Sequence, residues 1–311
     1  MNYTRRDLGK LALAALPAAT LFAKPDSNFG GVQIGINAPY SFHGAADSAE
    51  EVLAAMLKLG LSAVELRSQP VEAFLGAPAI PRGGRNATDE QRAARKSAIE
   101  DLQKWRMSAS IDGFKGFRKK YEDAGVNIDI VKFDGVQNMT DDELDYSFQI
   151  TKALGARFIT CEPPRSDTKR IGAFAEKHKL MVGYHGHANV TGAEAFGSPQ
   201  SWEEVMAYSK YNGANVDIGH FIAGNGVSPA GFIKKHHDRI TNLHIKDRKK
   251  DQGPNAPWGE GDTPIQEILQ LMRQEKYDFM ATIEMEHGVP EGSDTMAELA
   301  KCIQFCKDAL A

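Results

Sequence analysis

The alternation of short apolar strands with amphipathic helices is the feature that most restricts how this chain can fold. Eight apolar segments predict strands, and at least one segment with helical periodicity follows each of them. Repeated strand–helix units imply a parallel sheet, and eight of them predict closure into a single-domain α/β fold, a (β/α)8 barrel. An open doubly wound sheet is the alternative, but no Gly-rich phosphate-binding turn follows the first strand. The predicted strands are 33–43, 62–68, 126–133, 156–162, 180–185, 215–220, 240–246 and 279–284.

The segments between these strands predict the helices. Thr140 precedes the pattern Asp-Asp-Glu and resembles the start of a capping box, and Thr88 is expected to cap another helix. Pro70–Arg85 is rich in Pro, Gly and Ala and predicts a long loop. Together with the helix after it, this loop is predicted to form an inserted loop–helix at about 70–110. The barrel domain that contains the insertion is expected to span 30–311. The predicted helices are 49–59, 89–105, 114–124, 141–154, 170–178, 201–208, 229–237, 264–275 and 295–309.

Residues 1–23 have the pattern of a cleavable signal segment. The paired Arg5 and Arg6 precede an apolar run, Leu11–Phe22, that is too short to span a bilayer but suits a signal peptide. Ala23 is a small residue suited to the cleavage position. The paired arginines predict export by the twin-arginine pathway and a periplasmic location. A frayed apolar helix at the N-terminus is the alternative.

Polar groups of the kinds that bind metals are concentrated at the C-terminal ends of the predicted strands. Of nine histidines, six fall at or just past such ends, together with several acidic residues. Core packing explains this pattern poorly, because a buried His or Glu needs a partner for each polar atom. In a closed parallel barrel these ends share one rim, where catalytic residues lie. The strand-end residues are His43, Glu65, Glu162, His185, His187, Asp217, His220, His244, Lys246, Glu284, Glu286 and His287.

Carboxylates and imidazoles that converge in a barrel mouth would make a mixed oxygen and nitrogen site for a divalent ion. Mn²⁺, Co²⁺ and Zn²⁺ accept both ligand types, whereas Mg²⁺ binds nitrogen less readily. A single strand-end Glu is more often an ion-pair partner, so the prediction depends on the whole set coming together.

Several motifs of this chain resemble the xylose isomerase-like TIM-barrel superfamily, which includes sugar phosphate isomerases/epimerases, ketose 3-epimerases and endonuclease IV. The motifs are CEP at 161–163, YHGH at 184–187, VDIGH at 216–220, HIKD at 244–247 and IEME at 283–286. The resemblance implies that Glu162, Asp217, His244 and Glu284 are the metal ligands, with Glu162 and Glu284 also the acid/base pair. It implies that the substrate-binding residues are His185, His187, His220, Lys246, Glu65 and Trp258.

We therefore expect a metal-dependent isomerase or epimerase that abstracts a proton next to a carbonyl and passes through an enediolate. Because export is predicted, an unphosphorylated sugar or keto-sugar is the expected substrate. The ketose 3-epimerases carry an Arg about six residues after the ligand His, whereas Arg248 comes four residues after His244. Two alternatives stay open: a lyase that eliminates the aglycone of 3-keto-glycosides, and a carbohydrate-binding barrel without catalysis.

The charge balance argues against a nucleic-acid partner. The formal net charge is −4, and removing residues 1–23 makes it more negative, whereas nucleic-acid-binding surfaces are usually basic. No membrane span is expected in the mature chain. By analogy with relatives, a homodimer is expected.

Overall fold

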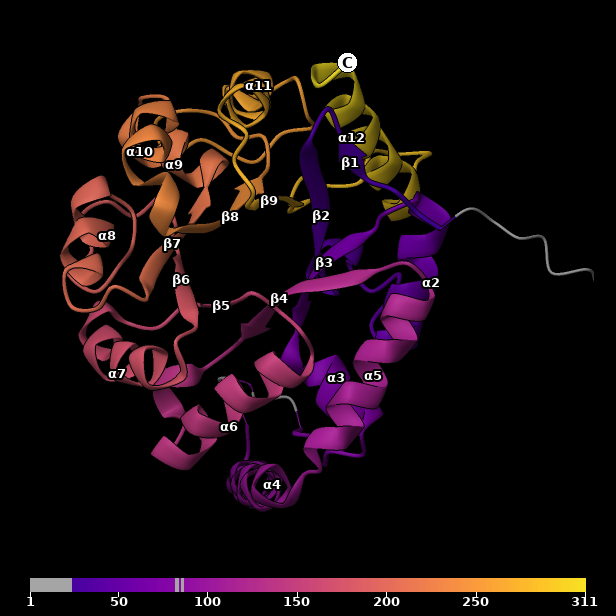
Figure 1. Cartoon of the computed structure of the whole chain (residues 1–311), viewed down its shortest axis with the longest axis vertical. Coiled ribbons are helices and arrows are strands. Elements are labelled where there is room, and N and C mark those ends of the chain that lie inside the picture. Colours follow the sequence, from indigo (N-terminus) through magenta and orange to yellow (C-terminus); the bar gives the residue numbers. More distant parts are fainter. Residues whose placement is uncertain (1–23, 82–83, 85–86) are drawn as a thin grey trace, which may run out of the picture.

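The computed structural model describes residues 24–81, 84 and 87–311, and in them eight parallel strands close into a barrel. Each of the eight pairs with the next along the chain, and β2 also pairs with β9, which closes the ring (Figure 1). A short strand, β1, pairs antiparallel with β2 at the N-terminal end of the domain. The strands are β1 (Asn28–Phe29), β2 (Val32–Ala38), β3 (Ala63–Arg67), β4 (Asn127–Phe133), β5 (Phe158–Cys161), β6 (Met181–His185), β7 (Asn212–Asp217), β8 (Ile240–Ile245) and β9 (Met280–Ile283).

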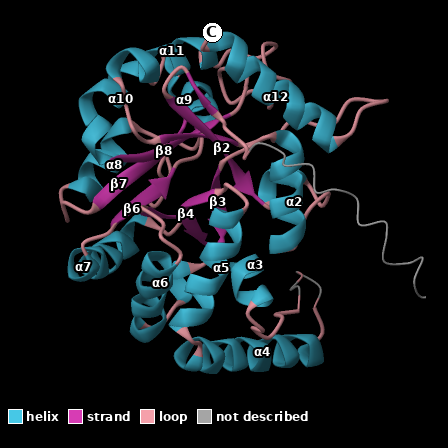
Figure 2. Ribbon diagram, turned by 45° about the vertical axis from the view of Figure 1, so that its right-hand side comes forward, coloured by secondary structure: helices cyan, strands magenta, loops and turns pink. Residues whose placement is uncertain are grey.

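Helices surround the ring of strands, and the two layers bury the core between them (Figures 1 and 2). The predicted capping box at Thr140 and the predicted cap at Thr88 are both present, and Thr88 also forms a capping box with the residue three positions later. The helices are α2 (Ala49–Leu59), α3 (Ser68–Phe74), α4 (Asp89–Ser108), α5 (Ile111–Asp123), α6 (Asp141–Ala153), α7 (Thr168–His178), α8 (Pro199–Met206), α9 (Ile218–Asn225), α10 (Ala230–His236), α11 (Ile265–Glu275) and α12 (Thr295–Ala309).

The predicted fold is confirmed, but several local predictions are wrong. The first strand ends at Ala38 rather than near His43, and a 3-10 turn, Tyr40–Phe42, follows it. The loop predicted from Pro70 instead begins with helix α3. The sixth barrel strand ends at Asp217 rather than His220, because the Asp217 carboxylate accepts a hydrogen bond from the backbone N–H of His220 and caps α9. His220 therefore lies in the first turn of a helix.

Helix α4 lies outside the ring of barrel helices, beyond α6 (Figures 1 and 2). Leu102 is the only one of its described side chains that is buried, so apolar packing alone holds it weakly. Arg106 instead forms a buried ionic link to the barrel. Its guanidinium donates to Glu72 of α3 at 2.8 and 3.1 Å and to Glu143 of α6 at 2.9 Å.

Arg106→Met is expected to lower the free energy of unfolding by about 3–5 kcal/mol, because it leaves two buried carboxylates side by side without a cation. Urea unfolding measures the change. Arg92→Met, on an exposed face of the same helix, is the matched control and should leave the unfolding midpoint unchanged. Equal small effects of the two substitutions would show that the buried link does not stabilise the fold.

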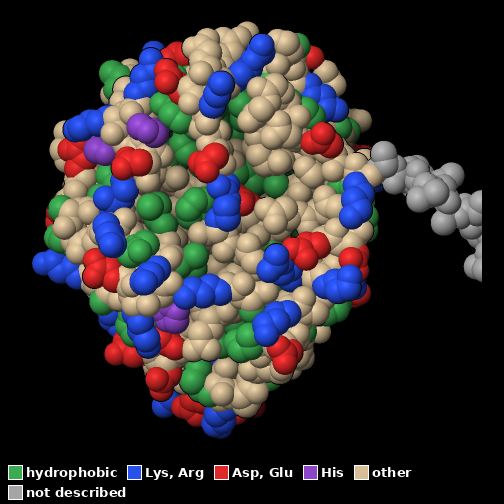
Figure 3. Space-filling model, viewed as in Figure 1, with side chains coloured by type: hydrophobic (Ala, Val, Ile, Leu, Met, Phe, Trp, Pro, Cys, Tyr) green, Lys and Arg blue, Asp and Glu red, His purple; other side chains and the backbone are tan. Residues whose placement is uncertain are grey.

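The surface shows no accumulation of positive charge on the face drawn in Figure 3, where basic and acidic side chains are interspersed. Within the described ranges, none of the helices has both the length and the apolar character needed to cross a bilayer. The predicted signal segment, 1–23, lies outside the described residues. Export of the protein therefore stays a prediction.

Candidate metal centre

Four buried side chains converge at the C-terminal ends of four barrel strands. His185 ends β6, Asp217 ends β7, His244 lies on β8, and Glu284 directly follows β9. Each offers one ligand atom, and these atoms all lie within 4.8 Å of one another. Asp217 and His244 are paired in register on neighbouring strands, so barrel closure brings residues about 100 positions apart to one point.

Three of these side chains each have a buried polar atom without a hydrogen-bond partner among the described residues. The atoms are Asp217 Oδ2, His244 Nδ1 and Glu284 Oε2. Buried polar atoms in folded proteins are normally hydrogen-bonded. All three atoms are of the kinds that bind divalent ions, and they belong to one cluster. The donor set therefore fits a metal ion, with two imidazoles and two carboxylates as the available ligands.

Lys246 is the cation closest to the acidic side chains of this cluster. Its Nζ lies 2.9 Å from Asp217 Oδ2 and 3.0 Å from Glu284 Oε2, both at ion-pair distance but without hydrogen-bond geometry, and it donates to Glu286 Oε2 at 2.5 Å. Only 1% of its surface is exposed. The resemblance implied that Lys246 lines the substrate pocket, with pairing to an acid of the rim as the alternative. In the structure it is paired with the acids around the ligand atoms.

Electrostatics around the cluster favour an additional cation. Burial raises the pKa of Asp217 to about 7, and the nearby charge of Glu284 adds to the shift. Burial alone would lower the pKa of His244, but the negative charges of Glu284 and Glu65 raise it to about 10. A divalent ion would neutralise the negative charge of the Asp217 and Glu284 carboxylates. It would also replace a proton on His244.

Glu162 was predicted to be a metal ligand, but it lies outside this four-residue cluster. Its carboxylate accepts from Lys132 Nζ at 2.5 Å and lies 3.2 Å from His187 Nε2. Burial would raise the pKa of Glu162, but His185, His187 and Lys132 together hold it well below its usual range, so this carboxylate is ionised at neutral pH. About a third of its side chain is exposed, so it can meet a substrate at the mouth.

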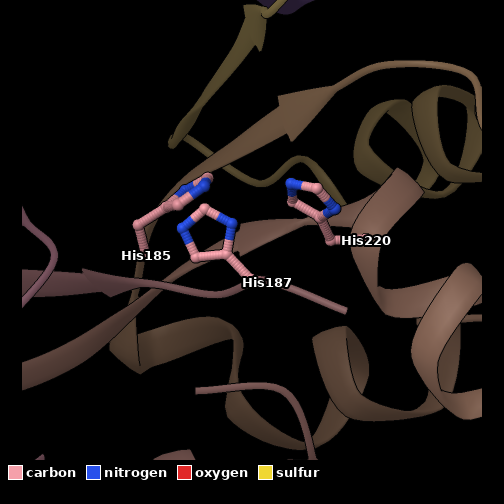
Figure 4. A group of neighbouring side chains, drawn as sticks. All are labelled: His185, His187 and His220. Atoms are coloured by element: carbon pink, nitrogen blue, oxygen red, sulfur yellow. The ribbon is translucent and has the colours of Figure 1, made fainter. Parts of the chain in front are cut away.

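His185 of the cluster also lies in a group with two further histidines, His187 and His220. The rings of His185, His187 and His220 lie next to one another, with 4.9 Å between the centroids of His187 and each of the other two (Figure 4). They form a second group with the spacing of metal ligands. Nε2 of His220 lies 2.9 Å from Lys246 Nζ, and His187 is half exposed. His187 can therefore contact a ligand that enters from solvent, whereas His220 is buried and its other ring nitrogen, Nδ1, contacts Arg248.

Two residues predicted to line the pocket lie elsewhere. Glu65 is fully buried, and its carboxylate accepts from Thr160, Asn242 and His244, so a substrate cannot reach it. Trp258 packs edge-on against Phe305 of α12. It lines a separate cavity of about 200 Å³ together with His287 and Glu298. His287 was also among the strand-end residues, but its side chain points to that cavity.

A polar layer that was not predicted from the sequence lies directly beneath the cluster. In a strand, residues i and i−2 point to the same side, so the residue two positions before each barrel-mouth residue also faces the interior. Four strands repeat the pattern of Thr or Asn, any residue, then an acid or His. This repeat was visible in the sequence as TCE at 160–162, NVD at 215–217, NLH at 242–244 and TIE at 282–284.

A family model described as the xylose isomerase-like TIM barrel matches residues 142–306, more than half of the chain. The chain belongs to the xylose isomerase-like TIM-barrel family. The match includes every member of the cluster from His185 to Glu284. A comparison with curated protein sequences found no significant match.

Several solved structures share this fold at low sequence identity. A D-psicose 3-epimerase with D-tagatose from Clostridium cellulolyticum H10 has a TM-score of 0.61 and 11% identity, with 90% of this chain and 99% of that chain covered. A sugar phosphate isomerase/epimerase from Parabacteroides distasonis ATCC 8503 has a TM-score of 0.58 and 16% identity, with coverages of 90% and 96%. The IolI protein with a bound zinc atom has a TM-score of 0.58 and 13% identity, with coverages of 89% and 96%.

Proposed function

We propose that this protein is a divalent-metal-dependent isomerase or epimerase acting on an unphosphorylated sugar or keto-sugar. The observation that carries the proposal is the cluster of His185, Asp217, His244 and Glu284, whose ligand atoms converge at the barrel mouth of a xylose isomerase-like family member. The psicose epimerase and the sugar phosphate isomerase/epimerase support the class of reaction by their shared fold. The absence of a phosphate on the substrate follows from the predicted export.

A bound divalent ion supplies Lewis-acid stabilisation of the negative charge that develops on the substrate carbonyl oxygen. The remaining chemistry belongs to the side chains of the mouth. Glu162 is ionised and partly exposed, so it is the group best placed to remove the proton next to the carbonyl, which leaves an enediolate. Glu284, from a strand on another side of the barrel, is the proposed partner that returns the proton. His187 and His220 are proposed to orient the substrate hydroxyls.

Lys132 and His187 hold the Glu162 carboxylate in place by contacts to different oxygens. Lys132 is 1% exposed, so it cannot be the group that exchanges protons with solvent. Its charge keeps Glu162 in the form that can accept a proton. Glu162 is therefore proposed as a base that lies beside the ligand cluster and is not itself a ligand.

Isotope exchange tests the reaction class. Incubation in D₂O with Mn²⁺ and candidate ketoses or aldoses is expected to put deuterium on the carbon next to the carbonyl, detected by mass spectrometry. An epimer or an isomer as the product supports the proposal. Release of a free aglycone from a 3-keto-glycoside would instead assign the lyase reaction, and exchange with none of these sugars would contradict the proposal.

Metal content tests the site separately from the reaction. The purified protein should contain about one divalent ion per chain for a site of this type, and His244→Ala should lose most of it, because His244 is one of the four convergent residues. Elemental analysis measures both. His237→Ala, which removes an exposed histidine at the end of α10, is the matched control and should keep its metal.

A further inference from the structure

A groove lies on the barrel rim between the beginning of α2 and helix α3, and we call it the α2–α3 groove. Three of its lining residues mark the C-terminal ends of neighbouring strands: Pro39 follows β2, Arg67 ends β3 and Asp134 follows β4. The groove therefore opens at the same rim as the ligand cluster. Its volume is about 760 Å³, within the range of sites that hold ligands of drug size.

Apolar residues make up half of the lining of the α2–α3 groove, and Phe74 is the largest of them. Its ring packs edge-on against Phe117, with 5.2 Å between the centroids, and Lys120 Nζ lies 4.6 Å from its centroid. These contacts hold the ring in place, yet 42% of the residue is exposed. Exposed apolar surface in a groove is typical of a ligand-binding site. The apolar lining residues are Pro39, Ala49, Pro70, Ala73, Phe74 and Ala79.

Several polar side chains of the groove are already paired with one another or with a neighbour. Arg67 and Gln69 both donate to Asp134 Oδ2, at 2.5 and 3.0 Å. Glu50 accepts from Lys120 Nζ at 2.5 Å. A ligand rich in hydroxyl groups would have to compete for these groups, whereas an apolar ring would leave their pairing intact. The lining therefore favours an apolar ring over a second sugar.

The charge of the groove disfavours an anionic ligand. Asp47, Glu50 and Asp134 line it together with a single basic residue, Arg67. Lys120 pairs with Glu50 at the side of the groove, so one negative charge remains without a compensating cation. Because like charges repel, an uncharged group is favoured over a phosphate or carboxylate.

Tyr40 connects the groove with the barrel mouth. Its hydroxyl donates to Glu286 Oε1 at 2.6 Å, and Lys246 donates to Oε2 of the same carboxylate at 2.5 Å. The guanidinium carbon of Arg67 lies 5.1 Å from the centroid of the Tyr40 ring. Glu286 and Tyr40 thus lie between Lys246, which is paired with the acids of the cluster, and Arg67, which lines the groove. Tyr40 is 40% exposed, so a ligand can extend across it from the mouth.

We propose that the α2–α3 groove binds an uncharged apolar ring attached to the sugar, so that the substrate is a glycoside with an aryl or similarly apolar aglycone. The sugar occupies the mouth, and the aglycone packs against Phe74. The position of the sugar rests on the proposed function. An anomeric carbon joined to an aglycone is an acetal and has no carbonyl group. The carbonyl that the reaction needs is then a ketone on the sugar ring, which narrows the proposed substrates to keto-sugars.

Paired glycosides test the groove by binding alone, since an ordinary glycoside has no carbonyl and is not turned over by this chemistry. The probes are methyl and phenyl glycosides of glucose, galactose and mannose, in both anomers, added to the purified protein with Mn²⁺. Calorimetry measures the affinities. For a sugar that binds, the phenyl glycoside should bind about 10–100-fold more tightly than the methyl glycoside, the range expected from burial of one aromatic ring.

Two substitutions in the groove test where the phenyl ring lies. Phe74→Ala removes its apolar contact, and Ala73→Phe fills the groove from an exposed position of the same helix. Each should reduce the phenyl preference to about 3-fold or less and leave the affinity for the methyl glycoside unchanged. Circular dichroism verifies that both variants fold. Tyr208→Ala removes an aromatic residue of similar exposure that does not line the groove, and as the matched control it should keep the preference.

Equal affinity for the two members of each pair, or no binding of any of them, would overturn the inference. A phenyl preference that survives both groove variants would place the aglycone elsewhere and overturn it as well. The D₂O exchange assay judges the proposed function separately. Exchange on a free sugar without any phenyl preference would refute only the glycoside substrate, whereas a phenyl preference without exchange on any sugar would support the groove and contradict the reaction.

Discussion

Removal of the metal ion is expected to reduce the rate of α-proton exchange by about 10³-fold or more. Lewis-acid stabilisation of the developing charge is worth several kcal/mol, and each 1.36 kcal/mol changes a rate tenfold. Without the ion, Asp217 and Glu284 are also left at ion-pair distance from Lys246, where they hold no substrate oxygen. Dialysis against a chelator, followed by the D₂O exchange assay, measures the loss.

Re-addition of metals is the control for this experiment. Co²⁺, Zn²⁺ or Mn²⁺ should restore the rate, and Mg²⁺ should restore less of it, because the cluster offers two imidazole nitrogens. The melting temperature should rise with the same ions, since a ligand that binds only the folded state stabilises it. Full activity in protein that contains no ion by elemental analysis would contradict metal dependence.

Glu162→Gln is expected to lower the exchange rate by about 10²–10⁴-fold, the usual contribution of a positioned proton-transfer group. The amide has nearly the same shape but cannot accept the substrate proton. Because Glu162 lies outside the four-residue cluster, the variant should keep its metal ion, so the loss should appear in kcat. Exchange kinetics and elemental analysis on the same preparation measure the two quantities.

Glu176→Gln, at an exposed position of α7, makes the same chemical change away from the mouth and should behave as wild type. If Glu162→Gln exchanges protons at the wild-type rate, another group is the base. Glu284 would then be the next residue to test, although its loss should also remove the metal.

The fold could be predicted from the sequence because its signals are local. Each barrel strand is a short apolar run next to an amphipathic helix, and these patterns depend on neighbours in the chain. The prediction that the strand extends to His220 was wrong because it relied on the same local pattern. The run through Ile218 continues as apolar, but a side-chain cap at Asp217 starts α9, and such a cap depends on one hydrogen bond that periodicity does not show.

The candidate site could be predicted only in part. The family resemblance selected Asp217, His244 and Glu284 as ligands from the strand-end residues, and the structure brings these three together. The strand-end pattern alone predicted only that such residues share one rim. It did not separate Glu162 from His185, because both lie at strand ends. Their surroundings differ: Lys132 from β4 engages Glu162, whereas Asn215 from β7 orients His185. Lys132 and Asn215 come from other strands, so the sequence around Glu162 or His185 does not show which partner each one has.

The sequence by itself determined that eight strand–helix units form a closed barrel and that acids and imidazoles gather at one rim, since strand direction and side-chain alternation follow from the local pattern. Only the tertiary structure decided which of these side chains share a cluster, and that Glu65 lies buried beneath it in contact with His244. Those properties depend on register and on contacts between strands up to 179 residues apart, which arise only when the barrel closes.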